Sequence, residues 1–385
     1  MRTLSIISLA VLSLLTLSCA REPVASEQVE LGIYVRLPEW PDTRADVGEV
    51  SPELAAEVTV KNLSIWVFLS DYYDDDRPAG YCLGYLNPSQ SKDPVTGNEN
   101  RYYMRIDADI ALAHPDVDVY VLANSGSSSM NMPSSGLNAS TPRDYLDNLL
   151  LNGTYYGIKA DGSPQCKAVP SGGFPFSAVG KRMRMKGNYP VMNLETVTLT
   201  RTVSKFRIVV SQLVDAVGPV MDFTIDEIAL EGGQFATSEY IFNGSFYPYK
   251  FVRSGQAADY IATPLRFTPP SHDDVARNPA PEQYAYGEGQ TGQEYENLVL
   301  QGIKDGVLTD IGVCYLRESD KPLAGHVTYT IGGVQSTAAF QMSEGASFAR
   351  NHSWIVYIYF LRDEMRFSVT WTDWVHGRDY DWSTE

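Results

Sequence analysis

The chain has 385 residues, of which 44% are hydrophobic, 11% aromatic and 20% charged, enough apolar material for one or two packed cores. Its formal net charge of −17 argues against a nucleic-acid-binding protein, because a phosphate backbone is bound by clustered lysine and arginine side chains. The 24 tyrosines, 30 glycines and 22 prolines favour short strands joined by many turns, so the composition predicts a mainly β protein.

The first twenty residues, MRTLSIISLAVLSLLTLSCA, have the pattern of an export signal. Arg2 is followed by an apolar run that is short for a transmembrane helix and ends in small residues. Cys19 stands directly after Ser18 at the end of this run, as in bacterial lipoprotein signals, where the thiol receives diacylglycerol. We therefore expect residues 1–18 to be removed and an acylated Cys19 to begin a membrane tether, residues 19–28. The alternative is an ordinary cleaved signal with an incidental cysteine.

Residues 29–37, VELGIYVRL, alternate in the manner of a β-strand. Apolar side chains fall on one face: Val29, Leu31, Ile33, Val35 and Leu37. Full burial of five such side chains stabilises a fold by roughly 1.5–3 kcal/mol each, on the order of 7–15 kcal/mol gross. We therefore expect a strongly held first strand, followed by an exposed loop, residues 38–50, that contains Arg44 and Ala45.

Further strand-like segments follow, each bounded by turn-forming residues. The strands are expected at residues 58–70, 102–113, 117–126, 195–213, 223–232, 308–319, 325–333, 353–363 and 365–374. The best helix candidate is 141–153, with Thr141 as its N-cap and Pro142 in its first turn. Within 195–213 the apolar positions change phase, which indicates a bulge or bend, and the polar, proline-rich residues 264–291 are expected to form a surface loop.

This order of segments predicts two β-sandwich-like domains that meet near residue 195. The first domain would span residues 29–194 and the second residues 195–385. Residues up to about Trp374 should form a fixed last strand, and 375–385 a mobile or donated tail.

The sequence gives no positive case for an enzyme, a cofactor or a metal. Residues 287–292, GEGQTG, match the dinucleotide fingerprint but lack the strand before it and the helix after it. The acidic run 71–76 lacks the alternation and glycine of a calcium loop, so a solvated hairpin turn is expected there. With Cys19 acylated, three cysteines remain, and an odd number cannot all pair; which of them pair stays open: Cys82, Cys166 and Cys314.

Several stretches resemble the fimbrillins, the subunits of type V pili in Bacteroidetes-type bacteria, including anchor and minor subunits. After the lipoprotein-like signal and first strand come NLSIWVF at 62–68 and VDVYVLANSG at 117–126. LTRTVSKFRIVV at 199–210 is similar to the stretch that opens the family's second domain, and CYLRES and RNHSWIVYIYF resemble its late strands. The matching residues include Ala123, Asn124, Arg201, Lys205, Tyr315 and Glu318, whereas Trp354 stands where tyrosine is usual.

The resemblance implies two tandem transthyretin-like β-sandwich domains and a structural role in a fimbria that supports adhesion. It also implies export to the outer membrane as a lipid-anchored precursor and cleavage by an arginine-specific protease in the loop after the first strand. Arg44 in PEWPDTRADVGEV is the expected site, because prolines and small exposed residues surround it, whereas Arg36 lies within the strand. Removing the strand would open a groove that a strand from another fimbrial subunit fills by β-strand addition.

Three alternatives stay open. The chain could be an anchor subunit that keeps its lipid and first strand, or a tip adhesin whose loops bind a host protein or glycan. It could also be a surface lipoprotein that binds or processes polysaccharide, which would require a concave cluster of aromatic residues with paired carboxylates.

Overall fold

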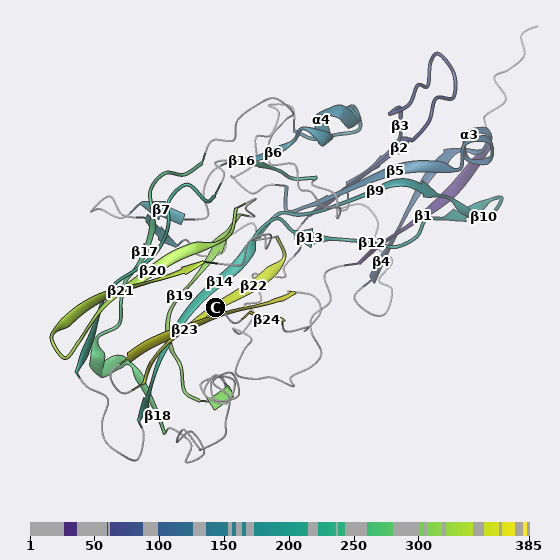
Figure 1. Ribbon diagram of the computed structural model, residues 1–385. Coiled ribbons are helices and arrows are strands. Elements are labelled where there is room, and N and C mark those ends of the chain that lie inside the picture. Colours follow the sequence, from purple (N-terminus) through teal and green to yellow (C-terminus); the bar gives the residue numbers. More distant parts are fainter. Residues whose placement is uncertain are drawn as a thin grey trace, which may run out of the picture.

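Strands dominate the chain in the computed structural model, and the prediction of a mainly β protein is confirmed (Figure 1). The structure describes residues 27–36, 60, 62–87, 99–125, 136–152, 156–158, 164–166, 173–214, 222–235, 238–242, 260–279, 301–302, 306–317, 321–341, 350–361, 364–373 and 380–382. The described helical segments are short: α3 (Ala108–Ala113), α4 (Arg143–Asp147) and the 3-10 turn η2 (His272–Asp274). No helix in this described part is long and apolar enough to span a membrane.

Two five-stranded sheets enclose the core of the N-terminal half. The first contains β1 (Gln28–Arg36), β4 (Glu99–Asp107), β10 (Lys186–Asn188), β11 (Val191–Asn193) and β12 (Val197–Thr198). The second has the order β13 (Thr200–Arg201), β9 (Phe176–Arg184), β5 (Asp116–Ala123), β2 (Leu63–Leu69) and β3 (Cys82–Leu86). Because side chains from both sheets meet in one hydrophobic cluster, these sheets form a sandwich.

Two further sheets enclose the core of the C-terminal half. One joins β14 (Ser204–Val214), β18 (Ala276–Pro279), β19 (Thr309–Leu316), β22 (His352–Leu361), β23 (Glu364–Asp373) and β24 (Tyr380–Trp382). The other has the order β17 (Leu265–Phe267), β15 (Phe223–Leu230), β20 (Ala324–Ile331) and β21 (Val334–Gln341). Two short antiparallel pairs complete the described strands: β6 (Leu150–Asn152) with β16 (Ser238–Tyr240), and β7 (Tyr156–Ile158) with β8 (Pro164–Cys166).

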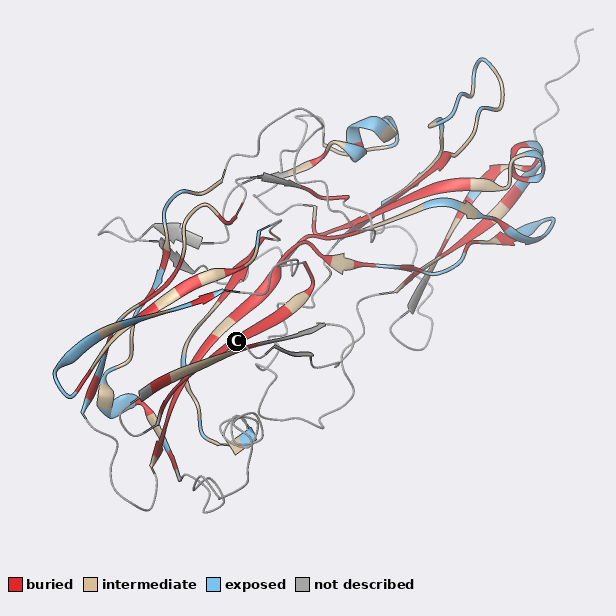
Figure 2. Ribbon diagram, in the orientation of Figure 1, coloured by how far each residue is buried: buried red, intermediate tan, exposed pale blue. Residues whose placement is uncertain are grey.

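Three hydrophobic clusters hold these sheets together. The N-terminal core takes its buried residues from positions 29 to 199, and the C-terminal core takes them from positions 206 to 369. A third cluster, here called the junction core, combines buried residues of both halves: Trp66, Phe68, Tyr120, Leu122, Leu146, Leu149, Phe174, Val203, Ile241, Phe242 and Tyr315. Figure 2 shows the buried positions concentrated along β2, β5, β14 and β22. The predicted domain limit between residues 194 and 195 lies a few residues before the end of the first core, which still includes Val197 and Leu199, and it stays a prediction.

The chain changes sheet where the sequence changes phase. Within the predicted strand 195–213, β12 belongs to the sheet of β1, β13 to the sheet of β2, and β14 to the C-terminal half. The pairing of β14 with β19 also shifts register between Ile208 and Val209. The bend predicted in this segment is therefore confirmed as passage between sheets, because a strand that leaves one sheet must turn to pair in the next.

Several predicted segments differ from the structure. The end of the segment 102–113 is the helix α3, because ADIALA is rich in the strongest helix former, and it buries Ala108, Ile110 and Ala111. The predicted helix 141–153 is confined to α4, because β6 pairs with β16 and leaves the helical path. Thr141 is not the N-cap; its hydroxyl instead accepts a hydrogen bond from the Asn138 amide at 2.9 Å.

Two other predictions differ from the structure: an expected loop contains strands, and one strand is absent from the predicted set. The region 264–291 was expected to be a loop, yet it contributes β17, η2 and β18. β21 was missed, and it pairs with β20 across eight residues although six of its side chains are polar or alanine. Tertiary pairing decides such edge positions more strongly than local composition does. At the C-terminus, residues 380–382 of the expected tail pair with β23 as β24.

Candidate functional site

The first strand, β1, is hydrogen-bonded along both edges. On one edge it pairs antiparallel with β4 over nine residue pairs, from Gln28 with Asp107 to Arg36 with Glu99. On the other edge it lies parallel to β11 and β12, in the segment 190–199. We call the space that β1 fills the β1 slot; β4 forms one wall of this slot and the segment 190–199 forms the other. Removal of β1 would leave unpaired backbone groups on both walls of this slot.

Backbone hydrogen bonds extend the parallel edge beyond the two short strands. The Glu30 amide donates to the Pro190 carbonyl at 2.9 Å, and the Leu194 amide donates to the Gly32 carbonyl at 2.9 Å. The Leu199 amide donates to the Arg36 carbonyl at 2.9 Å, so Arg36 is held within the paired part of the strand. Such a backbone cannot enter a protease cleft as an isolated extended segment. The cleavage site at Arg44 stays a prediction.

The inner face of β1 is part of the N-terminal core. Val29, Leu31 and Ile33 are completely buried and Val35 is 2% exposed, as the alternation predicts. Their neighbours on β4 are the buried side chains of Ile106, Met104 and Tyr102. Full burial of four aliphatic side chains corresponds to about 6–12 kcal/mol of gross stabilisation. The slot without its strand would therefore expose a continuous apolar floor.

The outer face of β1 carries a feature that the sequence pattern does not reveal. Gly32 is buried between Tyr103 of β4 and Asn193 of β11, with which it is directly in register. Arg101 of β4 reaches across β1, and its Nη2 donates to Asn193 Oδ1 at 2.7 Å. Its guanidinium carbon lies 5.1 Å from the ring centre of Tyr34 and 4.4 Å from that of Tyr103. We call this contact the Arg101–Asn193 bridge.

The remaining predicted site residues lie outside the described residues. These are the lipidation site Cys19, the cleavage site Arg44 and Ala45, and Leu37, the fifth apolar residue of the predicted strand. Their roles stay predictions. The described β1 ends at Arg36. Leu37 and then the predicted cleavable loop 38–50 follow it in the sequence.

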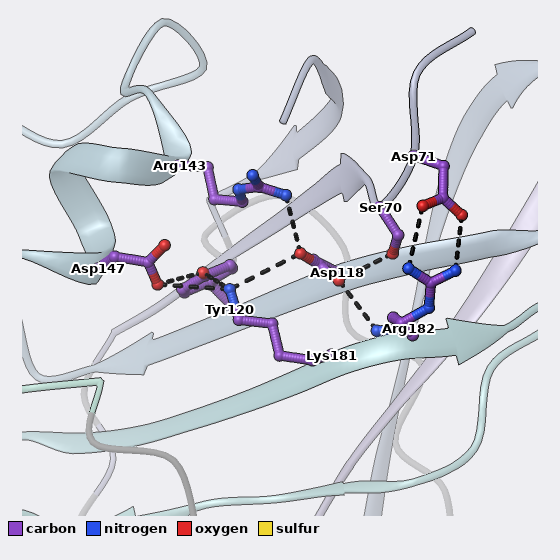
Figure 3. Close-up of polar contacts among 8 residues, drawn as sticks. All are labelled: Ser70, Asp71, Asp118, Tyr120, Arg143, Asp147, Lys181 and Arg182. Atoms are coloured by element: carbon purple, nitrogen blue, oxygen red, sulfur yellow. Dashed lines mark hydrogen bonds and ion pairs between the residues drawn. The ribbon is translucent and has the colours of Figure 1, made fainter. Parts of the chain in front are cut away.

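A second group of polar side chains lies on the sheet of β2, β5 and β9, beside α4 (Figure 3). Asp118 sits where the pairing of β5 with β9 shifts register, and it is only 4% exposed. Its Oδ1 accepts from the Ser70 hydroxyl at 2.8 Å and from the Arg182 amide at 2.9 Å, and its Oδ2 accepts from Arg143 at 3.0 Å. Both carboxylate oxygens are thus occupied by donors within the chain.

Tyr120, Asp147 and Lys181 extend this group toward α4. The Tyr120 hydroxyl donates to Asp147, and the Lys181 ammonium donates to the Tyr120 oxygen. Burial of the Tyr120 ring and its hydrogen bond to Asp147 raise the pKa of this phenol above its ordinary value. The hydroxyl therefore remains protonated at neutral pH, and the group joins α4 to the sheet without offering a nucleophile.

The residues that carry the family resemblance lie between the two halves. Asn124 is buried with a φ of 57°, and its Nδ2 donates to the Phe174 carbonyl at 2.7 Å. The rings of Phe174 and Tyr315 have their centres 4.6 Å apart, within the junction core. Arg201 and Lys205 are also buried, at 1% and 2% exposure. These positions connect the two sandwiches; Glu318 lies outside the described residues.

The acidic run at residues 71–76 forms the turn between β2 and β3, as predicted. Asp74 Oδ1 accepts from the amides of Asp76 at 3.1 Å and Arg77 at 2.8 Å, and the Arg77 guanidinium pairs with Asp74 at 2.6 Å. Among the residues that the structure describes, no group of histidine, cysteine and acidic side chains is arranged to hold a metal ion. Cys82 and Cys314 form no disulfide with each other.

Comparison with known proteins finds similarity to solved structures. No protein-family model and no curated protein matches the chain. A protein from Bacteroides eggerthii with a proposed role in cell adhesion is 14% identical, with a TM-score of 0.46, over 91% of this chain and 97% of that chain. The tip fimbrial protein Mfa3 from Porphyromonas gingivalis, truncated at its C-terminus, is 14% identical, with a TM-score of 0.45, over 90% of this chain and all of that chain.

A fimbrial assembly protein from Parabacteroides distasonis is similar over 93% of this chain and all of that chain, at 13% identity and a TM-score of 0.40. The structural neighbours are thus fimbrial and cell adhesion proteins, the class that the sequence motifs indicate. Because the identities and TM-scores are low, these matches carry no argument about the activity of this chain.

Proposed function

We propose that this chain is a structural subunit of a cell-surface fimbria that is exported as a lipoprotein and assembled by strand exchange. The observation that carries the proposal is the position of β1, a strand from the start of the described chain that fills the centre of a sheet. It can leave as one piece, because its covalent connection to the other described strands runs through the segment that follows Arg36. Its departure would open a slot with an apolar floor and two hydrogen-bonding walls.

The proposed activation step is cleavage between Arg44 and Ala45 by an arginine-specific protease. This cut would separate the mature subunit from both the lipid on Cys19 and the strand β1. The buried side chains of β1 hold it in place by about 6–12 kcal/mol gross, so the strand would leave only in exchange for one that restores similar burial. Exchange of this kind allows a filament to grow, because a strand of the next subunit refills each slot that β1 has left.

The proposal is tested by the N-terminal sequence of the protein recovered from sheared cell-surface filaments. We expect Ala45 as the first residue, and we expect Arg44→Ala to leave the chain lipidated, closed and absent from filaments. Arg36→Ala is the matched control, because Arg36 is paired within β1 and its loss should not change processing. Filaments that contain the chain with residues 29–37 still attached would contradict strand exchange at this slot.

An anchor subunit is the second candidate, and the complete burial of the inner face of β1 favours it, since a strand so held can be permanent. In that case the chain would remain in the outer membrane fraction with Cys19 as its first residue, at the base of filaments. The same N-terminal sequencing separates the two functions.

A further inference from the structure

We propose that the β1 slot accepts only a strand with glycine at the position of Gly32, because the Arg101–Asn193 bridge closes over that position. This inference rests on the proposed function and specifies the partner of the same site. The bridge connects the two walls of the slot, since Arg101 belongs to β4 and Asn193 to β11. Any strand that enters must pass beneath it.

The space under the bridge admits a side chain only if Asn193 and Arg101 move. A methyl group placed on Gly32 would overlap Asn193 Oδ1 and would lie 3.0 Å from Arg101 Nε and 3.1 Å from Arg101 Nη2. The two tyrosine rings on either side of the guanidinium, Tyr34 and Tyr103, limit how far Arg101 can move away. The Arg101 Nε is itself buried without a hydrogen-bond partner among the described residues.

The bridge therefore fixes the register of the strand. A slip by one residue would place Leu31 or Ile33 beneath the guanidinium and would turn the apolar side chains of β1 away from the core. A slip by two residues would place Glu30 or Tyr34 there, and neither side chain fits. The partner segment must carry small apolar or aliphatic residues at the four inward positions and glycine between the second and third of them, as in Val-x-Leu-Gly-Ile-x-Val.

This pattern points to another kind of subunit and not to the C-terminal tail of a second copy. Within residues 374–385 the glycine is Gly377, and it is flanked by His376 and Arg378. With Gly377 beneath the bridge, both flanking side chains would face the apolar floor, where an unpaired charge is strongly disfavoured. The occupant is therefore an extended segment of a different subunit with glycine between aliphatic residues.

The test uses the full chain, cut after Arg44, and labelled synthetic peptides that correspond to residues 27–37. We expect the parent peptide to refill the slot, and Gly32→Ala and Gly32→Val peptides to bind at least about tenfold more weakly, with Val the weaker. A Glu30→Ala peptide is the matched control, because Glu30 shares the outer face but lies away from the bridge; it should bind within about threefold of the parent. Asn193→Ala in the cut chain should recover most of the affinity that the Gly32→Ala peptide loses.

Two further measurements separate the inference from the proposed function. In the uncut chain, Asn193→Ala should reduce the drop in melting temperature caused by Gly32→Ala, which tests the bridge without any exchange. Equal binding of the parent and Gly32→Ala peptides would overturn the glycine requirement while strand exchange stands. Failure of every peptide to enter the cut chain would overturn strand exchange and the inference with it, and tight binding of a peptide of residues 374–385 would show that a second copy is the partner.

Discussion

Asn351 Oδ1 accepts a hydrogen bond from the Arg201 guanidinium at 3.2 Å, although the two residues are 150 positions apart in the sequence. Asn351 adopts a φ of 60°, and its amide donates to the Val203 carbonyl at 2.9 Å. Arg201 is 1% exposed and lies 5.5 Å from the ring centre of Phe176. A buried arginine of β13, in the second sheet of the N-terminal half, is thus hydrogen-bonded to the turn that leads into β22 of the C-terminal half.

Arg201→Ala should lower the free energy of unfolding by about 1.5–3 kcal/mol or more, because it removes a charged, buried hydrogen bond and leaves a void. Chemical denaturation of the full chain measures this difference. The matched control is Arg207→Ala on β14, where Arg207 pairs at 2.9 Å with Asp310, a residue at 43% side-chain exposure. Loss of this partly exposed pair should cost about 1 kcal/mol or less, and equal costs for both arginines would contradict the assigned role of Arg201.

Asn124 should tolerate glycine better than alanine. Its left-handed backbone costs an ordinary side chain about 1–2 kcal/mol, which glycine avoids, and both variants lose the hydrogen bond to the Phe174 carbonyl. Asn124→Ala should therefore be less stable than Asn124→Gly by about 1 kcal/mol in denaturant unfolding. If alanine proved as stable as glycine, the left-handed conformation at this position would not be the reason for asparagine.

Much of the strand content could be predicted from the sequence, because it depends on local alternation. Val29, Leu31, Ile33 and Val35 fall on one face in the sequence and are all buried in the structure. The same kind of pattern located β2, β5, β14 and β22, whose apolar residues face the cores. The helix α3 was mistaken for the end of a strand, because a short alanine-rich stretch is compatible with either structure until its neighbours are known.

The Arg101–Asn193 bridge could not be predicted in this way. Gly32 between the aliphatic residues Leu31 and Ile33 is the available signal, since glycine within a strand often marks the close approach of another group. The group that approaches it is a side chain 69 positions later, and its hydrogen-bond partner is 92 positions beyond that. Only the pairing of β1 with both β4 and β11 brings these three residues together.

The stability of the C-terminal sandwich should fall as the pH rises through the titration of His326. Burial of its ring disfavours the charged form, but hydrogen bonds to Glu231 at 2.5 Å and Glu227 at 3.5 Å outweigh this, and the pKa of His326 is raised above 6.5. Arg266 on β17 pairs with Glu227 at 2.6 Å and moderates its charge. A raised pKa in the folded state means that the stabilisation is complete below about pH 6.5 and is lost above the folded-state value.

The free energy of unfolding, measured by denaturant titration between about pH 6 and about pH 8, should therefore decrease with a slope that His326→Gln reduces. Glu231→Gln should reduce the slope as well, because it removes the nearer carboxylate. A slope unchanged in both variants would show that another group controls the pH dependence in this range.

Cys19 should carry the lipid. Cells grown with a clickable fatty acid should label the wild-type chain and not Cys19→Ser, because the thiol is the only acceptor in the expected signal. Cys82→Ser is the control and should keep the label. Equal labelling of the wild type and Cys19→Ser would exclude acylation at this residue.

Deletion of residues 375–385 should stop filament growth beyond the truncated subunit and leave the chain folded. β23 keeps its ten residue pairs with β22 in this variant, whereas β24 contributes three pairs, from Val369 with Trp382 to Trp371 with Tyr380. The unfolding transition should therefore remain cooperative, and its midpoint should move little. If the tail is donated to a different kind of subunit, the truncated chain can still receive a strand at the β1 slot but cannot supply one, so filaments should end at it and be shorter. Filaments of normal number and length in the deletion strain would exclude donation by this tail.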